Sequence, residues 1–400
     1  MNDELERLQA YPFQKLADLL NSTSTKSKDK AIALTIGEPK HTPPDFVLKF
    51  FQDSRKLSAA LGSYPATQGS KSLRDSVAQF LGKRYDLKTP VDSERQILPV
   101  NGTREALFAI AQCVISNKSP GLVLMPNPFY QIYEGAGILA GSKPHFINCF
   151  EDTNFQPNFE KVDQSTWAKC KLLYICTPGN PSGAVIPMET MKQLIQLSDE
   201  HNFVIVSDEC YSEIYHTESS PPPGLLQACD RLNRSTFKNC LVFNSLSKRS
   251  NLPGLRSGFV AGDAEIIEKF LLYRTYHGSA MPLHHQFVSE LAWADEDHVI
   301  QNRSLYRKKV SAIKKALETV LSVPAPECGF FLWPKTPGSD TQFSLDLFEQ
   351  TNTKALPGSF LSRNTPEGNP GKNRVRLALV NSLEECEEAA IRIRQFMNNQ

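Results

Sequence analysis

The sequence lacks several features that would assign a chain of this size to other classes of protein. Its 44 lysine and arginine residues nearly balance its 43 aspartate and glutamate residues, which gives a net charge of +1. A nucleic-acid or anionic-membrane partner normally requires a strong basic bias, so neither is expected. There is no apolar run of the roughly 18 residues that a membrane-spanning helix needs. The first residues, Met1 to Glu4, lack the pattern of a signal peptide, and a cytoplasmic location is expected.

Cysteine and glycine motifs of other enzyme classes are also missing. The nine cysteines are scattered, and no two have Cys-x-x-Cys spacing, so neither a metal site nor a redox motif is indicated. Reduced thiols in a cytoplasmic protein are the simplest account of this cysteine usage. No Gly-x-Gly-x-x-Gly motif follows the first predicted strand, which counts against a nicotinamide-dependent Rossmann enzyme.

The chain does contain a regular alternation of short apolar runs and longer helical stretches. The apolar runs that we predict as buried strands are 96–100, 121–125, 145–147, 171–176, 203–207, 240–243 and 258–261. Continuous apolar strands separated by helices indicate a largely parallel sheet that is covered on both faces. The sequence therefore predicts an α/β fold.

The length of 400 residues exceeds a single typical core, so two domains are expected. A break in composition at 322–326 precedes a part that we predict as α+β. We assign residues 1–45 to an N-terminal arm and part of the small domain. Residues 46–295 would form the large domain, with a long helix over 264–294, and residues 296–400 the small C-terminal domain with a linking helix.

Polar side chains gather where the predicted strands end. Asn180 follows one apolar run, Asp208 and Tyr211 follow the next, and Lys248 follows a third. Ligands of parallel sheets bind beyond the carboxyl ends of the strands. We therefore expect these side chains to meet at one site.

The stretch from Ser245 to Arg256 carries the most specific chemistry. Burial would lower the pKa of Lys248 and make its amine a better nucleophile towards a carbonyl group. The hydroxyls of Ser245 and Ser247 and the guanidinium of Arg256 are groups that suit a phosphate. Taken alone, the stretch is more typical of a solvated surface loop, since such loops are common, and the case for chemistry depends on the residues elsewhere in the chain.

A second candidate anion site lies at residues 101–105. There a predicted strand turns into a helix, and Asn101 or Thr103 can cap a helix whose first N–H groups are free. The alternative for this pattern is an ordinary helix cap.

Taken in order, these residues and several others resemble the fold-type-I aminotransferases of classes I and II, which use pyridoxal phosphate. The matching stretches are 36–39, 64–65, 102–103, 128–130, 180–183, 208–211, 245–248 with Arg256, 357–358 with Phe360, and Arg374. The resemblance covers nearly the whole chain. It implies a large domain with a mostly parallel seven-stranded sheet, a small α+β domain, and a homodimer with shared active sites that acts on an amino donor and a 2-oxo acid.

The resemblance also implies a role for each matched residue. Lys248 would form the Schiff base with the cofactor and carry a proton between substrate and cofactor. Asp208 would pair with the pyridine nitrogen, which makes the ring an electron sink. Tyr211 and Asn180 would hydrogen-bond the phenolic oxygen of the ring. Tyr130 would stack on the ring, and core packing is its alternative.

Further matched residues would hold the phosphate and the substrate. The implied cofactor contacts are Gly102, Thr103, Arg104, Ser245, Ser247 and Arg256, with Tyr64 reaching the phosphate of the neighbouring subunit. Gly37 and Asn180 would contact the substrate, and Arg374 would clamp its α-carboxylate. Arg376 lies two residues further on the same strand face and is the rival for that role.

Within the family, several stretches are similar to N-succinyl-diaminopimelate aminotransferases of bacterial lysine biosynthesis. These stretches are 11–13, 36–41, 127–135, 273–279 and 374–380. The similarity implies transfer of an amino group from N-succinyl-L,L-2,6-diaminopimelate to 2-oxoglutarate. The distal carboxylate of that donor needs a further partner, for which Lys40, Arg249 and Arg376 are candidates.

Three alternatives share the same scaffold. Aspartate, alanine or aromatic aminotransferases would carry the same cofactor residues, and a β-lyase or decarboxylase is open because a fold does not fix a reaction. A ligand-sensing regulator would need an attached DNA-binding module, and the N-terminal segment is too short and too little basic for one.

Overall fold

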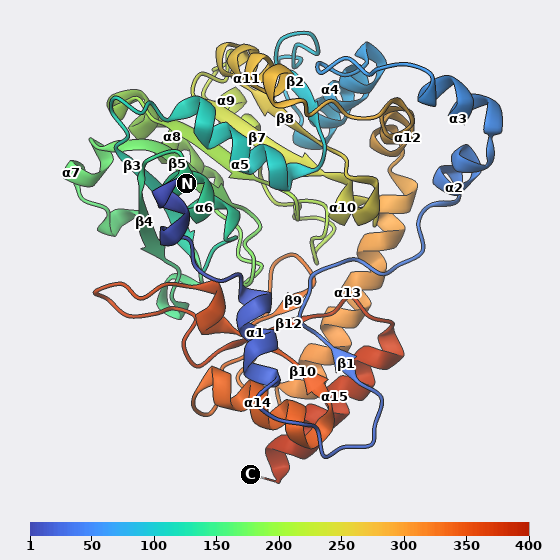
Figure 1. The fold of residues 1–400 in the computed structure, drawn as a ribbon, viewed down its shortest axis with the longest axis vertical. Coiled ribbons are helices and arrows are strands. Elements are labelled where there is room, and N and C mark those ends of the chain that lie inside the picture. Colours follow the sequence, from blue (N-terminus) through green and yellow to red (C-terminus); the bar gives the residue numbers. More distant parts are fainter. Residues whose placement is uncertain (400) are drawn as a thin grey trace.

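A seven-stranded sheet forms the upper part of the molecule in Figure 1. The computed structural model describes residues 1–399. In spatial order the strands are β2 (Ile97–Val100), β8 (Gly258–Gly262), β7 (Cys240–Ser245), β6 (Val204–Asp208), β5 (Cys170–Cys176), β3 (Leu122–Asn127) and β4 (Lys143–Asn148). Strands β3 to β7 run parallel to one another, and β8 is antiparallel to both β2 and β7. The predicted α/β fold with a mostly parallel sheet is confirmed.

Helices cover both faces of this sheet. Leu172 belongs to one core and Leu173 to the other, because successive side chains of a strand point to opposite faces. The first face packs against α5 (Thr103–Val114), α6 (Ile132–Leu139) and α11 (Ala264–His277). The second packs against α4 (Lys71–Tyr85), α8 (Met188–His201), α9 (Leu225–Arg231) and α12 (Leu283–Ala294). Burial on both sides explains why the strands are apolar throughout.

Two small sheets lie below the large one in Figure 1. In the first, β12 (Val375–Ala378) lies between β11 (Leu356–Pro357) and β9 (Phe331–Leu332), and in the second, β1 (Ile32–Ala33) pairs with β10 (Thr353–Lys354). Helices α13 (Asp297–Leu317), α14 (Asp340–Thr351) and α15 (Leu383–Asn398) pack around them. In Figure 1, α13 runs down from α12 towards the small sheets and so joins the two parts of the molecule.

The helix α1 (Pro12–Leu20) packs on this lower part. Its Leu16 and Leu20 belong to one hydrophobic cluster with Trp333 and Leu356. Proline at the first position of the helix lacks only an N–H that would have no partner there, so the helix begins at Pro12. The N-terminal residues thus join the small sheets, while the expected domain boundaries stay a prediction.

The prediction of one long helix over 264–294 is wrong, because the helix is interrupted near its middle. Helix α11 ends at His277, and the next residue, Gly278, has a φ of 82° and forms the left-handed cap that glycine favours. Helix α12 begins only after Pro282.

The other elements are α2 (Asp45–Gln52), α3 (Ser54–Leu61), α7 (Gln164–Trp167), α10 (Leu246–Arg249) and the short 3-10 turns η1 (Asp3–Arg7), η2 (Glu151–Thr153), η3 (Phe159–Lys161), η4 (Pro253–Leu255) and η5 (Gly358–Leu361). No helix within residues 1–399 combines the length and the apolar character that crossing a membrane requires.

Candidate active site

A cavity of about 590 Å³ opens where β5, β6 and β7 end, between the large sheet and the small ones. Its walls come from segments that are far apart in the sequence, including the N-terminal residues, the start of α5 and the loops after the three strands. The residues singled out from the sequence that line it are Gly37, Thr103, Arg104, Tyr130, Asn180, Asp208, Tyr211, Ser245, Ser247, Lys248, Arg256 and Arg376. The position is the one at which α/β sheets bind ligands.

Lys248 lies on the single turn α10 that follows β7. The hydroxyl of Ser245 accepts a hydrogen bond from the N–H of Ser247 at 3.0 Å, which caps this turn and fixes the lysine at the strand end. The Lys248 ammonium donates to the carbonyl of Gly37 and lies 5.6 Å from the centre of the Phe330 ring. Burial lowers the pKa of Lys248 to about 8. A much larger fraction of this amine is therefore neutral and nucleophilic near neutral pH than for an exposed lysine.

Asp208 ends β6 at the floor of the cavity and is buried. One carboxylate oxygen accepts a hydrogen bond from the Tyr133 hydroxyl at 2.6 Å, and the other accepts one from the N–H of Cys210 at 3.2 Å. Burial raises the pKa of Asp208, and the bond from Tyr133 acts in the opposite direction. Sequence reasoning missed Tyr133. Tyr130 precedes α6 and does not lie on it, so no helical spacing connects Tyr133 to the residues singled out from the sequence.

The N-terminus of α5 forms part of the cavity wall, because Thr103 is the first residue of this helix. Gly102 precedes the helix with a φ of 79°, and a Cβ atom at this position would overlap the guanidinium of Arg256. Glycine therefore permits the close approach of Arg256 to the free N–H groups of the first turn. Thr103, Ser245 and Ser247 add hydroxyl groups to the same wall. A helix N-terminus next to a guanidinium and hydroxyls is an arrangement that binds a phosphate group.

Arg104 and Tyr130 form a neighbouring part of the wall. The Nε–H of Arg104 donates to the Tyr130 hydroxyl at 2.7 Å, and both residues line the cavity. Burial raises the pKa of Tyr130, so its hydroxyl stays protonated near neutral pH. The other N–H groups of the Arg104 guanidinium form no side-chain hydrogen bond or ion pair within residues 1–399. These N–H groups of the Arg104 cation are therefore available to donate to a bound ligand.

The family model of aminotransferase class I and II matches residues 29–393 of the chain. The chain belongs to this aminotransferase family. It is 29% identical over 397 residues to an LL-diaminopimelate aminotransferase of Halothermothrix orenii, which covers 98% of this chain and 97% of the relative. The expected family and fold are confirmed.

Solved aminotransferase structures superpose closely. An aminotransferase from Neisseria meningitidis is 44% identical, with a TM-score of 0.94 over 99% of this chain and 100% of that one. The aminotransferase AspB from Helicobacter pylori is 31% identical, with a TM-score of 0.88 over 98% of this chain and 100% of that one.

Aminotransferases of this family depend on pyridoxal phosphate, and the residues present fit that group. The phosphate would meet the N-terminus of α5 and Arg256. Within residues 1–399, the buried Asp208 carboxylate has no ion pair, so it can take a protonated ring nitrogen as its cation. The partly buried Lys248 supplies the amine.

The assignment of the carboxylate clamp to Arg374 is wrong. The Arg374 guanidinium donates to a carboxylate oxygen of Glu151 at 2.6 Å and to the carbonyl of Trp333 at 3.0 Å, and it is not part of the cavity wall. Its rival Arg376 lines the cavity and donates to the side-chain oxygen of Asn180 at 2.9 Å. Arg374 directly precedes β12, whereas Arg376 lies within it, and only Arg376 reaches the cavity.

Arg376 is a buried cation without a carboxylate partner among residues 1–399. Burial lowers the pKa of its guanidinium to about 10, and its Nε atom has no hydrogen-bond partner. An unpaired buried guanidinium is costly unless an anion neutralises it. Arg376 is therefore the side chain in this aminotransferase that is best placed to receive a carboxylate.

Other residues named from the sequence lie outside the cavity wall, and Gly102, which directly precedes α5, is one of them. Lys40 donates to Asn381 at 2.7 Å, and the fully buried Arg249 pairs with Glu296, so neither is placed to bind a distal carboxylate. Tyr64 is fully exposed on the surface after α3. Its expected contact with the phosphate of a neighbouring subunit stays a prediction.

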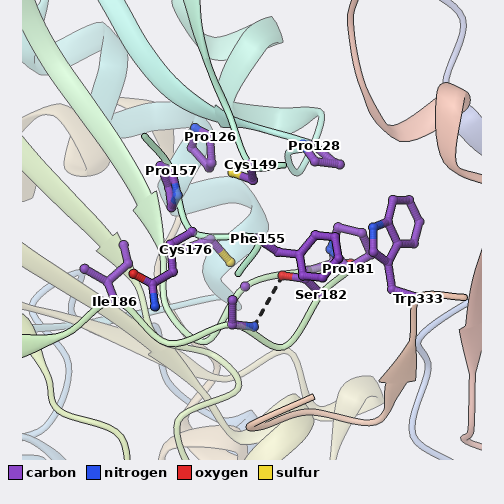
Figure 2. A pocket seen from close by; sticks show the side chains of 14 residues that line it. Pro126, Pro128, Cys149, Phe155, Pro157, Cys176, Pro181, Ser182, Ile186 and Trp333 are labelled. Atoms are coloured by element: carbon purple, nitrogen blue, oxygen red, sulfur yellow. Dashed lines mark hydrogen bonds between the residues drawn. The ribbon is translucent and has the colours of Figure 1, made fainter. Parts of the chain in front are cut away.

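A second, much smaller cavity lies beside Pro181 and Ser182 (Figure 2). Its volume is about 20 Å³, and its wall includes Cys149, Cys176 and Phe155. This space is comparable to that of one or two water molecules. It cannot hold a substrate, and the larger cavity is the candidate active site.

Proposed function

We propose that this aminotransferase converts N-succinyl-L,L-2,6-diaminopimelate and 2-oxoglutarate into N-succinyl-2-amino-6-oxopimelate and glutamate. The observation that carries the proposal is that, besides Arg256 at the phosphate site, two further guanidinium groups, Arg376 and Arg104, lie in the wall of one large cavity. A donor with a carboxylate near the reacting carbon and another far from it would engage both. The sequence similarities at 36–41 and 374–380 support the same donor.

In this proposal the residues at the strand ends hold the cofactor. Pyridoxal phosphate supplies an electron sink for the bond-breaking at the α-carbon of the substrate. Lys248 provides the amine that attaches the cofactor and moves the proton at that carbon. The buried Asp208 carboxylate would hold the ring nitrogen, and the side chains of Asn180 and Tyr211, which line the same cavity, would hydrogen-bond the phenolic oxygen. Tyr130 would stack on the ring.

Two further groups of residues bind the phosphate of the cofactor and the α-carboxylate of the substrate. Gly102, Thr103, Ser245, Ser247 and Arg256 form the phosphate site at the start of α5. Arg376 binds the α-carboxylate through its planar, two-pronged donor set, with Asn180 as its neighbour. The carbonyl of Gly37 lies beside the reacting amine.

Arg104 is proposed as the partner of the distal carboxylate. It lines the same cavity as Arg376 and offers donors that no side chain of residues 1–399 uses. Its sequence-based assignment to the cofactor is thereby changed to the substrate. An ion pair between Arg104 and the distal carboxylate would let the site discriminate against amino donors that lack this carboxylate.

Unmodified L,L-diaminopimelate is the second candidate donor. Curated relatives at 29% and 27% identity carry the name LL-diaminopimelate aminotransferase. Glu38 also lines the cavity, and its carboxylate could face the free distal ammonium that this donor carries. The succinylated donor has an amide there instead.

The deciding experiment compares amino donors on the purified holoenzyme with 2-oxoglutarate as acceptor. The kcat/KM for N-succinyl-L,L-diaminopimelate should exceed those for aspartate, alanine and phenylalanine by about 100-fold or more. A higher value for L,L-diaminopimelate would transfer the proposal to the second candidate. A better rate with aspartate or an aromatic donor would reject both while leaving aminotransferase activity intact.

The Arg104→Gln variant separates substrate binding from cofactor binding. It should lose about 10-fold or more of kcat/KM for the succinylated donor, with alanine turnover and cofactor absorbance unchanged. Arg231→Gln is the matched control, since Arg231 pairs with Asp86 at 3.3 Å and lies outside the cavity wall. Loss of cofactor from Arg104→Gln would instead support the original assignment.

We also propose a homodimer with shared active sites. Helices α2, α3 and α12 pack together and expose a group of large apolar side chains, namely Leu48, Phe51, Leu61, Phe287 and Leu291. Such a patch commonly marks a protein interface. Tyr64 extends from the end of α3 beside it, where it could enter the site of a second copy. The cytoplasmic location stays a prediction.

A further inference from the structure

The segment 36–41 crosses the mouth of the candidate active site without any helix or strand of its own. Ile36, Gly37 and Glu38 line the cavity, and the carbonyl of Gly37 accepts a hydrogen bond from Lys248. The residues before it are fixed to the small sheets, where the carbonyl of Leu34 accepts from the N–H of Ala378 at 2.8 Å. Within residues 1–399 the other end of the segment has no such backbone pairing, and it is held by the side chain of Lys40, which donates to Asn381 at 2.7 Å, and by the contacts of His41.

His41 is held by one face of α13. Its Nδ1 lies 2.7 Å from the side-chain oxygen of Asn302, and its Nε2 lies 2.7 Å from the ammonium of Lys309. Its ring also packs on Tyr306 with a centroid distance of 4.3 Å. Positions 302, 306 and 309 share a helix face because they are four and three residues apart.

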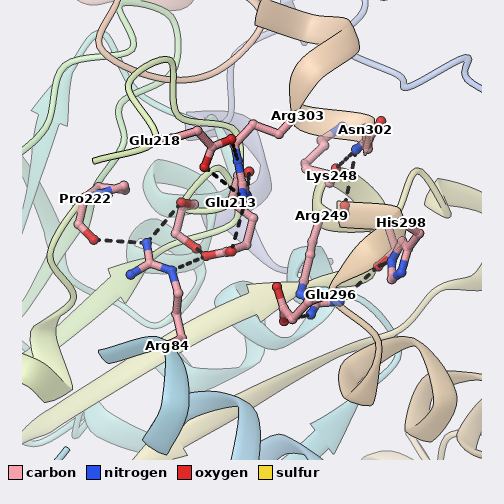
Figure 3. A network of polar contacts seen from close by, with 12 residues as sticks. Arg84, Glu213, Glu218, Pro222, Lys248, Arg249, Glu296, His298, Asn302 and Arg303 are labelled. Atoms are coloured by element: carbon pink, nitrogen blue, oxygen red, sulfur yellow. Dashed lines mark hydrogen bonds and ion pairs between the residues drawn. The ribbon is translucent and has the colours of Figure 1, made fainter. Parts of the chain in front are cut away.

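Asn302 connects this contact to the turn that carries Lys248. Its side-chain nitrogen donates to the carbonyl of Lys248 at 3.1 Å and to that of Arg249 at 3.2 Å. Figure 3 shows Asn302 directed towards the backbone beside these two residues. Since both amide hydrogens are used there, the oxygen of Asn302 is the atom that faces His41.

The partners of His41 determine its tautomer. An amide oxygen only accepts, so the Nδ1 atom must carry the hydrogen. An ammonium group only donates, so the Nε2 atom must be the unprotonated acceptor for Lys309. A doubly protonated ring could not accept from Lys309, and burial lowers the pKa of His41, which also favours the neutral ring. Its backbone is fixed as well, because the N–H of His41 donates to the side-chain oxygen of Asn251 at 3.2 Å.

We propose that neutral His41, with its hydrogen on Nδ1, is a positioning residue that holds segment 36–41 over Lys248 by bonding Asn302. The proposal rests on the role assigned to Lys248 above and goes beyond it. One amide side chain fixes both the turn of the reactive lysine and the segment whose Gly37 carbonyl meets that lysine. A released segment would have to be ordered again each time substrate binds.

The test compares His41→Phe with His41→Asn in the holoenzyme. Phenylalanine keeps the ring on Tyr306 but loses both hydrogen bonds, while the asparagine amide can still donate from the position of Nδ1. Amide hydrogen exchange of peptides covering 34–43 should be about tenfold faster in His41→Phe and close to wild type in His41→Asn. This readout does not depend on which substrate the enzyme uses, so it separates this proposal from the proposed function.

Kinetics add a second readout. In His41→Phe the KM for the amino donor should rise about tenfold while kcat stays within about twofold. The reason is that the apparent affinity for substrate falls with the fraction of molecules in which segment 36–41 is held in its binding position. His41→Asn should recover the wild-type KM. Should His41→Phe not fold, His41→Ala offers the same comparison with a smaller side chain at this half-buried position.

A nearby histidine provides the matched control. His298 also lies on α13 and contacts a neighbouring loop, with its Nε2 at 2.8 Å from the hydroxyl of Ser250, but it does not touch segment 36–41. His298→Asn should leave exchange of peptides 34–43 unchanged. Wild-type exchange in His41→Phe, or equal acceleration in His41→Phe and His41→Asn, would overturn the proposal.

Discussion

At the scale of single residues, Lys248 combines a reactive amine with an environment that lowers its pKa to about 8. An exposed lysine titrates near 10.4. The neutral, nucleophilic fraction of Lys248 therefore grows as pH rises through about 8 rather than through 10.4. This difference can be observed in the apoprotein.

We predict that the rate at which the apoprotein captures pyridoxal phosphate rises with pH around a midpoint of about 8. Stopped-flow absorbance measures this rate, and borohydride reduction should leave the label on the peptide that contains Lys248. Lys248→Ala should bind the cofactor through the phosphate contacts but show no covalent label and no turnover. A label on another lysine would disprove the assignment.

Asp208 depends on a neighbour that no local sequence pattern reveals. Tyr133 donates to its carboxylate across 75 positions of sequence, and the Tyr133 ring stacks on that of Tyr174 at 4.6 Å. The hydrogen bond favours the ionised carboxylate against burial, which raises the pKa of Asp208. Its loss should weaken the charge presented to the cofactor ring.

We predict that Tyr133→Phe lowers kcat about tenfold, whereas Asp208→Asn lowers it by about 100-fold or more with the fold preserved. Steady-state transamination rates and the absorbance spectrum of the bound cofactor measure these effects. Tyr174→Phe is the control, because the Tyr174 hydroxyl bonds the carbonyl of Leu107 at 2.6 Å and not Asp208. Near-normal turnover in Asp208→Asn would show that this carboxylate does not support the electron sink.

At the scale of elements, the large sheet could be predicted because its strands are buried on both faces. Leu172 and Leu173 are both fully buried, and continuous apolar runs of this length are typical of strands covered by helices on both sides. The break at Gly278 and Pro282 could not be predicted in the same way, because helical periodicity continues on both sides of it. A break of this kind depends on single residues and not on the pattern around them.

Strand β12 shows why part of the site could not be predicted. Alternation places Arg374 and Arg376 on the same strand face, but the sequence does not say which end of the strand meets the cavity. The surroundings decide this. The Arg374 guanidinium donates its hydrogen bonds to Glu151 and to the carbonyl of Trp333, whereas the Arg376 guanidinium donates to Asn180 in the cavity wall.

We predict that Arg376→Lys raises the KM for both amino donor and 2-oxo acid by about 30-fold, because lysine cannot form the two-pronged contact. Arg374→Lys, the matched variant on the same strand, should change KM less than about twofold. Initial rates over a range of substrate concentrations measure both values. Larger effects at position 374 than at position 376 would reverse the assignment.

At the scale of the whole molecule, one chain builds a cavity from its N-terminal segment, its large sheet and its small sheets. The exposed Tyr64 and the apolar patch on α2, α3 and α12 are left without a role in a single chain. A second copy that covers the patch and receives Tyr64 would account for both. Such an arrangement can be tested by making each chain defective in a different way.

We predict that mixing inactive Lys248→Ala and Tyr64→Phe chains restores activity, provided that Tyr64→Phe is itself strongly impaired. If Tyr64 serves the opposite site, each mixed dimer holds one site with no substitution and one site with both. Random mixing at equal amounts should then recover about one quarter of wild-type activity. Activity after dissociation and reassociation measures this, with hybrid formation followed by differential tags.

The control mixes Lys248→Ala with Asp208→Asn chains. Both residues line the cavity of their own chain, so every site in this hybrid keeps one defect and no activity should return. Equal recovery in both mixtures would mean that something other than shared sites restores activity. A fully active monomer in sedimentation, or no recovery with Tyr64→Phe in verified hybrids, would place Tyr64 outside the site, because only a residue that crosses the interface can complete the site of its partner.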